Sequence, residues 1–435
     1  MQNIRGKVAA ILIVMMIVPS SVYANEYVGE SVEVGTIATE SNTTESNMTE
    51  SNAVRTKSFV PKNVEVASLS NTQLERVIIG QENRSRVTEY YLDKYPFCCI
   101  CCIQIEYTFE NSRDSGYSYG TGFMAGKNSV YTNAHIFERD DYYVDSEGNL
   151  LEDVEDIEDG TLLEKAVYKG ATVRMCFRFN PRYEEYDWDY YVAEIDINCI
   201  DFVNDFGYNP LLVSMPTNDE DLNLMRGFRA IDYGIINLEY AHKNKNIHEK
   251  VGYLGFSSEN IGSATIAGYP VYSTKEIIDN KSMNLDLVRY LYKDTMLIPL
   301  KKILIGLTDK VEVYNISHLQ VMLKAAGTLN EYIKNDNYEK QLPNYFDTTT
   351  TYYYQINTSS GQSGSPIVSV NNGKDFSNDP QEMLVNGIHS GVWNYKIRSG
   401  NSIKNIPRNQ GMKITTEFIN MIVEKGYAEY YEESK

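Results

Sequence analysis

The sequence predicts an all-β protein built as an antiparallel barrel or sandwich. From residue 98 onward, short runs rich in Val, Ile, Tyr and Thr are separated by Gly, Asn, Asp and Ser, which is typical of strands joined by turns. Helices do not alternate with these runs, so a parallel α/β sheet is not favoured. The expected strands are 99–108, 120–125, 128–132, 171–179, 189–197, 231–238, 263–268, 351–357, 365–370, 384–389 and 411–415.

Two segments of the C-terminal half have apolar residues at helical spacing. From Thr416 to Lys425 this spacing predicts a helix that closes the chain. The leucine-rich stretch 283–335 also looks helical, and we expect it to form an inserted helical subdomain beside the strands.

The N-terminus is typical of a secretory signal. Arg5 and Lys7 precede an apolar run over 8–18, and Ala24 supplies a small residue for cleavage, so 1–24 is predicted to be a signal peptide. The run is too short to span a bilayer comfortably. We expect the protein to be secreted into the extracellular space as a monomer without a membrane anchor.

Residues 25–76 have the composition of a disordered linker or pro-segment. The sequence Thr-Glu-Ser-Asn occurs three times, at 39–42, 44–47 and 49–52. Such polar, low-complexity sequence does not bury enough apolar surface to order itself. The remainder, 77–435, is expected to be one domain, with room for insertions beyond the roughly 250 residues of a large all-β unit.

The formal net charge of -19 argues against nucleic acid as a partner, because affinity for phosphates comes from Lys and Arg. Much of the acid lies in 138–165, which we interpret as a solvated surface insertion. The alternative is a structural calcium site, since hard cations take carboxylate oxygens. No other cofactor is expected.

Four of the six cysteines flank Ile100 in the run Cys98-Cys99-Ile100-Cys101-Cys102, and Cys176 and Cys199 stand apart. On a strand the four thiols would alternate between faces and would not converge on one metal. No His lies at ligand spacing nearby. Disulfides, buried free thiols and a redox or metal site are the alternatives, and the sequence does not give a connectivity.

The run from Gly361 to Pro366 sets Ser363 among glycines. A nucleophilic serine needs small neighbours, so that a carbonyl can approach while backbone N–H groups point at the developing oxyanion. A plain turn is the alternative reading. His135 and Asp232 precede Ser363 in the chain, and the order His, Asp, Ser is one of the known orders of a catalytic triad.

Seven short segments carry a resemblance to a known family. They are Val77-Ile78-Ile79-Gly80 with Arg84, Gly120-Thr121-Gly122-Phe123, Thr132-Asn133-Ala134-His135, Asp232-Tyr233-Gly234, Gly268-Tyr269-Pro270, Gly361 to Pro366, and Gly387-Ile388-His389-Ser390-Gly391. Together and in this order they resemble the secreted bacterial glutamyl endopeptidases (staphylococcal and bacillar type), which are serine proteases of the chymotrypsin fold.

The resemblance implies two six-stranded antiparallel barrels with the active site between them. It implies that Ser363 is the nucleophile, His135 the general base and Asp232 the residue that orients the imidazole. The N–H groups of Gly361 and Ser363 would form the oxyanion hole. It also implies a zymogen that is cut near Val77, after Glu75 or Arg76.

In the family a histidine and a threonine of the specificity pocket receive a glutamate side chain, which implies that His389 and Thr358, with Ser390 and Gly391, bind substrate. Charge-assisted hydrogen bonds to the carboxylate make such a pocket physically reasonable. This chain departs from the family in having Val392 after Gly391, and 394–408 looks inserted. The resemblance to endopeptidases implies that proteins and peptides are the substrates. The alternative is a secreted binding protein without catalysis on the same fold.

Overall fold

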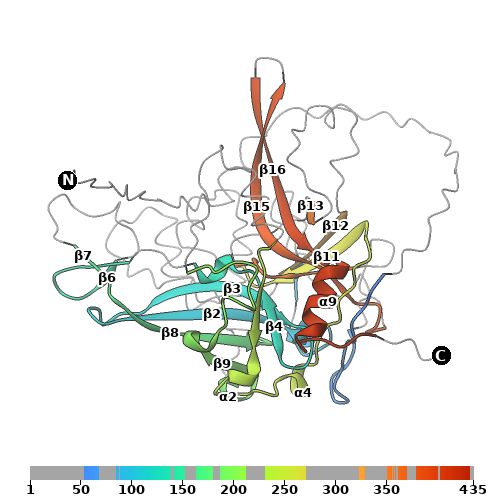
Figure 1. The fold of residues 1–435 in the computed structure, drawn as a ribbon, viewed down its shortest axis with the longest axis horizontal. Helices are drawn as coiled ribbons and strands as arrows, with labels where there is room; N and C mark the ends of the chain where they lie inside the picture. Colours follow the sequence, from blue (N-terminus) through green and yellow to red (C-terminus); the bar gives the residue numbers. More distant parts are fainter. Residues whose placement is uncertain are drawn as a thin grey trace, which may run out of the picture.

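The computed structural model describes residues 53–67, 85–87, 89–138, 142–151, 163–179, 187–211, 231–270, 323–328, 350–354, 356, 358, 361–369, 379–399 and 402–431. The signal segment 1–24 and the expected cleavage point before Val77 lie outside them. The described chain is mostly antiparallel sheet with few helices, which confirms the expected all-β fold class (Figure 1).

The first sheet has six strands in the order β10-β4-β3-β2-β8-β9, and all its pairs are antiparallel. Along its central strand, Ile103, Ile105 and Tyr107 are buried and alternate with more polar residues, as expected where one face of a strand covers a core. The strands are β2 (Ile100–Phe109), β3 (Gly116–Met124), β4 (Ser129–Thr132), β8 (Tyr168–Phe177), β9 (Val192–Asp196) and β10 (Gly234–Asn237).

The second sheet has seven strands in the order β1-β12-β11-β14-β15-β16-β13. Its longest strands, β15 and β16, continue past the sheet as a hairpin that projects from the rest of the molecule (Figure 1). The strands are β1 (Ser85–Arg86), β11 (Ser263–Gly268), β12 (Leu323–Thr328), β13 (Thr351–Tyr354), β14 (Pro366–Ser369), β15 (Val385–Ser399) and β16 (Ser402–Lys413).

The C-terminal helix α9 (Thr416–Glu424) confirms the helix expected at the end of the chain. Thr415 caps it by accepting a hydrogen bond from the backbone N–H of Phe418. The Phe418 ring packs edge-on against Tyr131 and Phe256, so α9 covers the aromatic core behind β4. The other helices of the described residues are short: α1 (Glu89–Leu92), η1 (Phe97–Cys99), η2 (His135–Phe137), α2 (Trp188–Tyr191), η3 (Ile197–Cys199), η5 (Leu238–Tyr240) and α4 (His248–Val251).

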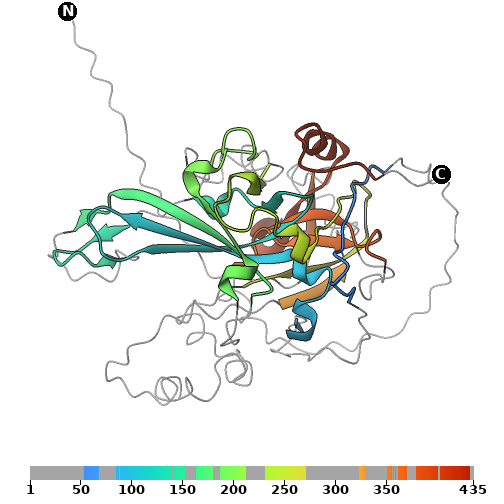
Figure 2. The same ribbon diagram turned by 90° about the horizontal axis from the view of Figure 1, so that it is seen from below.

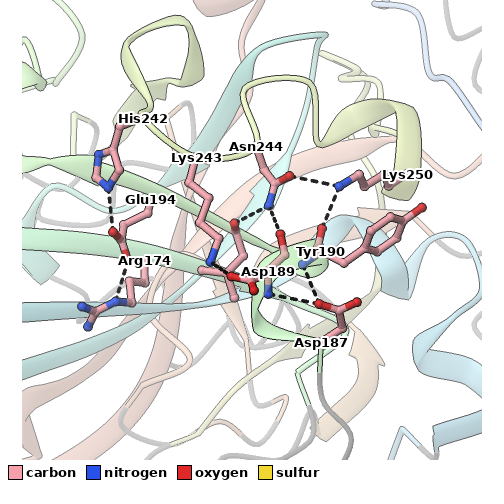
Figure 3. A network of polar contacts seen from close by, with 10 residues as sticks. Arg174, Asp187, Asp189, Tyr190, Glu194, His242, Lys243, Asn244 and Lys250 are labelled. Carbon is pink, nitrogen blue, oxygen red and sulfur yellow. Dashed lines mark hydrogen bonds and ion pairs between the residues drawn. The ribbon is translucent and has the colours of Figure 1, made fainter.

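A polar network ties α2 and β9 to the segment 242–250 (Figure 3). Asn244 has a left-handed φ of 52°, and its Nδ2 donates to the carbonyls of Asp189 and Val192 at 2.7 and 2.8 Å. Glu194 on β9 accepts from Arg174 of β8 and contacts the ring of His242. These bonds fix the loop that follows η5 at the edge of the first sheet.

The acidic insertion contains a small three-stranded sheet, β6-β5-β7, at the far end of the long strands β2, β3 and β8 (Figure 2). Its turn is closed by Asp145, whose carboxylate accepts hydrogen bonds from Glu147 N and from both N and Nδ2 of Asn149. Within the described ranges no group of three or more His, Cys, Asp or Glu residues converges as a metal site would require. Residues 152–162 lie outside them, so calcium here stays a prediction. The strands are β5 (Tyr143–Val144), β6 (Leu150–Leu151) and β7 (Glu164–Lys165).

Two expectations from the sequence are wrong in part. Leu323–Thr328, expected within the helical insertion, is strand β12, because it pairs with β11 on one side and with β1 on the other. Pairing on both edges outweighs the helix propensity of its Ala, Leu and Lys residues. The rest of 283–335 lies outside the described residues. Residues 53–67, expected to be disordered, pack on the body of the protein.

All six cysteines are described, and all are free thiols. Cys98 and Cys99 lie in η1 rather than on a strand, and both Sγ atoms contact the carbonyl of Val251. Burial raises the pKa of Cys176 to about 12 and the pKa of Cys101 and of Cys102 well above the ordinary thiol range. Thiols held in the protonated form are poor nucleophiles, which weighs against the redox alternative. Among the described helices, none is long and apolar enough to cross a membrane.

Candidate active site

The antiparallel pair β4–β10 brings His135 and Asp232 to the same end of the first sheet. Gly234, the first residue of β10, is in register with Thr132, the last residue of β4. Asp232 therefore precedes the start of one strand by two residues, and His135 follows the end of the other by three. The segment after β4 turns at once into η2, which begins at His135.

The two side chains make a two-point contact. The Nδ1 atom of His135 lies 2.8 Å from Oδ2 of Asp232, and the backbone N–H of His135 donates to Oδ1 at 3.2 Å. Asp232 is only 1% exposed, whereas the His135 side chain is 26% exposed. Asn133 donates from Nδ2 to the carbonyl of Asp232 at 2.7 Å. The carboxylate thus sits behind the imidazole and fixes the orientation of its ring.

Ser363 lies in a tight turn before β14. The carbonyl of Gln362 accepts from both N and Oγ of Ser365, at 3.0 and 2.6 Å. Gly361 and Gly364 have φ angles of 82° and 88°, which residues with a side chain rarely adopt. A Cβ on Gly364 would also lie 2.3 Å from Oγ1 of Thr132 and 2.0 Å from the carbonyl of Thr121. Glycine is therefore required beside Ser363 by both conformation and space.

Thr121 of β3 joins this turn to the first sheet. Its N–H donates to the carbonyl of Ser363 at 2.8 Å, and its Oγ1 donates to the carbonyl of Gly361 at 2.8 Å. The same Oγ1 accepts from the N–H of Tyr269, just after β11. On the other side, the N–H of Gly364 donates to the carbonyl of His389 at 2.8 Å. The turn is held between the two sheets.

The structure brings the predicted catalytic residues into one region. His135 and Asp232 are bonded directly, and the turn of Ser363 packs on Thr132, three residues before His135. The hydrogen bonds among described residues do not include one between Ser363 and His135. Among the hydrogen bonds between described residues, none is donated by the N–H groups of Gly361 and Ser363.

His389 on β15 is buried and bonded to a tyrosine. Its Nδ1 lies 2.5 Å from Oη of Tyr354 on β13, and that hydroxyl is 3.0 Å from the carbonyl of Gln410. Burial lowers the pKa of His389 to about 3, so its imidazole is neutral at neutral pH. Burial also raises the pKa of Tyr354 well above its ordinary value, so the phenol keeps its proton.

Two of the other predicted pocket residues, Ser390 and Gly391, directly follow His389 on β15. Ser390 accepts through its Oγ from Asn133 Nδ2 at 3.3 Å, which links it to the residue that also holds Asp232. Gly391 has a φ of 133° at a bulge where the β15–β16 register skips Ser390. The Oγ1 of Thr358 is buried and has no hydrogen-bond partner among the described residues. Beyond Gly391 the chain continues as the hairpin, in which the backbone of Val392 pairs with Asn409.

Three residues of this region were not predicted from the sequence: Thr121, Asn133 and Tyr354. Thr121 and Asn133 lie within segments that carry the family resemblance, but the sequence does not predict what their side chains do. Tyr354 sits on an expected strand, where Tyr352 and Tyr354 alternate as buried residues. Nothing local signals that its hydroxyl meets a histidine 35 residues away.

No family model matches the chain, and no curated protein matches it. Among solved structures, it is similar to one described as Glu endopeptidase in complex with MPD. That likeness has 16% identity and a TM-score of 0.36, and it covers 80% of this chain and 99% of the other. A second similar structure, described as GrC, has 11% identity and a TM-score of 0.35, with 80% and 98% of the two chains covered.

Proposed function

We propose that this protein is a secreted serine endopeptidase with His135, Asp232 and Ser363 as its triad. The observation that carries the proposal is the two-point contact of His135 with the buried Asp232, beside a glycine-flanked serine turn. A carboxylate behind an imidazole is needed wherever a neutral histidine must take up a proton and hold it briefly.

The chemistry follows from these positions. Because Nδ1 faces Asp232, proton transfer proceeds through Nε2 of His135. Ser363 Oγ attacks the scissile carbonyl carbon and gives its proton to Nε2, while the carbonyl π electrons move to oxygen. The N–H groups of Gly361 and Ser363 stabilise that oxyanion. Nε2 then protonates the leaving amine as the C–N bond breaks, and water activated by the same nitrogen hydrolyses the acyl-enzyme.

Among the described residues no hydrogen bond joins Ser363 to His135, and this does not remove the assignment. Catalytic hydrogen bonds are often long before substrate binds and tighten in the complex. The departure from the family at Val392 is the observation that favours the second candidate, a secreted binding protein on the same fold. The two candidates differ in whether Ser363 reacts.

The pocket around His389 favours an acidic residue before the scissile bond. The Tyr354 hydroxyl donates its one proton to the carbonyl of Gln410, so Nδ1–H of the neutral His389 donates to Oη of Tyr354 and Nε2 has no proton. The hydroxyl of Thr358, which has no hydrogen-bond partner among the described residues, is a donor for a substrate carboxylate. We propose that Nε2 takes up a proton together with the acidic side chain and becomes the second donor. Ser390 and Gly391 complete the wall of this pocket. We assign to the pocket a preference for Glu, or Asp, before the scissile bond.

We place this activity outside the cell, in a monomeric zymogen cut after Glu75 or Arg76. The test is digestion of a mixed peptide library by the purified protein cut at that point, beside Ser363→Ala. Cuts after Glu or Asp that disappear in the variant support both the triad and the pocket. Cuts after other residues that disappear in the variant support the triad and overturn the roles of Thr358 and His389. Absence of cuts from a folded, processed sample overturns the enzyme and favours the binding protein.

A further inference from the structure

Residues 54–67, here called the N-terminal strap, lie within the segment that the sequence assigns to a linker or pro-segment. In the structure the strap runs across the body beside the C-terminal segment, which is distant from it in the sequence (Figures 1 and 2). It forms single bridges with Tyr253, Ser257, Tyr430 and Tyr95, which belong to three separate parts of the chain. It is therefore bound at several places rather than at one.

The first half of the strap fits between two backbone segments. On one side Thr56 N donates to the carbonyl of Phe256 at 3.0 Å, and Phe256 N donates back to Thr56 Oγ1 at 2.7 Å. Phe59 and Tyr253 exchange two backbone hydrogen bonds of 2.9 Å. On the other side Lys57 N donates to the carbonyl of Glu429, at 2.9 Å. The strap thus acts as a shared strand, satisfying backbone groups of both neighbours.

Two glycines of the body make room for the strap. A Cβ on Gly255 would lie 2.4 Å from the carbonyl oxygen of Thr56, and a Cβ on Gly252 would lie 2.4 Å from that of Phe59. By contrast, a Cβ on Gly262, farther along the same segment, would meet nothing within 4 Å. The body is shaped to the backbone of the strap at the two places where they touch most closely.

The second half of the strap is anchored near α1. Ala67 N donates to the carbonyl of Tyr95, and Tyr95 N donates to the carbonyl of Glu65, both at 2.9 Å. Ala67 is fully buried, and Lys94, itself 8% exposed, reaches Glu65 at 2.6 Å. The ion pair Lys57–Glu429 is exposed and adds little. Backbone pairing and burial therefore hold the strap, not surface charge.

We infer that the strap is a permanent part of the folded protein, which stays bound when the chain is cut between residues 68 and 84. The contacts of 54–67 described above involve none of the residues His135, Asp232 and Ser363. Cutting after Glu75 or Arg76 would then give a two-chain protein, not a free pro-peptide. The inference does not rest on the proposed function, because the cut can be made by another protease.

The test is an engineered cut in the full chain. A recognition site for a sequence-specific protease is placed between Gln73 and Leu74, the chain is cut to completion, and the product is run on gel filtration and identified by mass. The strap fragment should elute with the body at micromolar protein and separate only in denaturant. Elution of the fragment apart from a folded body would overturn the inference, since the cut removes the advantage of covalent linkage.

A matched pair of variants tests the fit itself. Gly255→Ala places a Cβ against the strap and should release the fragment at least tenfold faster after cutting, whereas Gly262→Ala should keep it bound. Equal retention in both would overturn the docking described here. If Gly255→Ala does not fold, Thr56→Val replaces it: the variant loses the acceptor for Phe256 N, and the fragment should again dissociate faster. Circular dichroism establishes that each body is folded.

Discussion

His389 and Tyr354 are joined by a contact of 2.5 Å between Nδ1 and Oη, and both side chains are buried. The bond ties the strand that carries the predicted pocket histidine to β13, two positions along the second sheet. It makes Tyr354 a positioning residue, because it fixes the ring of His389 and decides which nitrogen carries the proton.

Tyr354→Phe should reduce selectivity for Glu while sparing the chemistry. Loss of one buried hydrogen bond costs about 1–3 kcal/mol, so kcat/KM on a Glu substrate should fall roughly 5- to 150-fold. The value on a peptide with a neutral residue before the cut should change far less. Kinetics on the two substrates give the ratio, and thermal unfolding shows that the variant is folded. Equal losses on both substrates would contradict a role in specificity.

Asp232→Asn should leave the fold intact and lower kcat by a factor of about 10⁴, because the amide favours the wrong tautomer of His135. The measurement is turnover of one peptide by wild type and variant, with KM determined separately. A change confined to KM would mean that the His135–Asp232 contact serves binding alone.

The buried His389 should make the protein less stable in mild acid. Its pKa is lowered to about 3 in the fold, against about 6.5 when unfolded. Between these values the unfolded chain binds the proton and the folded chain does not, so stability is present above pH 6.5 and is lost as pH falls toward 3. The slope from this group is up to about 1.4 kcal/mol per pH unit. Urea unfolding at pH 7 and pH 5 measures it, and His389→Gln should show a smaller loss than wild type. Equal losses would contradict the buried, neutral histidine.

The thiols should divide into one reactive group and five protected groups. Cys199 is exposed, whereas Cys98, Cys99, Cys101, Cys102 and Cys176 are buried. A thiol reagent should therefore modify one cysteine rapidly in the native protein and all six in denaturant, with Cys199→Ser removing the rapid phase. Two or more missing thiols in denaturant would reveal a disulfide.

The sequence predicted strands where the local pattern is strong and failed where distant partners decide. The segment 263–268 was predicted at its observed bounds because turn residues flank a run of small and β-branched side chains. Leu323–Thr328 was expected to be helical, since its Ala and Leu residues favour a helix and its two partner strands are distant in the chain. The prediction of disorder for the strap was wrong for the same reason. Its polar composition predicts disorder, and the backbone groups with which it forms hydrogen bonds are distant in the chain.

The candidate site shows the same division. His135, Asp232 and Ser363 were chosen by motif and order, and the structure brings the first two into contact and places the third in the neighbouring turn. Tyr354 was not chosen, because its hydroxyl has a role only once β13 and β15 are assembled in one sheet. A long-range hydrogen bond of this kind leaves no local pattern to read.

The central claim is that Ser363 is a nucleophile activated by His135. The most direct measurement is labelling of the folded protein with a fluorophosphonate, followed by mapping of the modified residue by mass spectrometry. The account predicts a label on Ser363 that is absent from Ser363→Ala and strongly reduced in His135→Ala. An unlabelled protein that is folded and cut before Val77, or a label that persists in both variants, would contradict it.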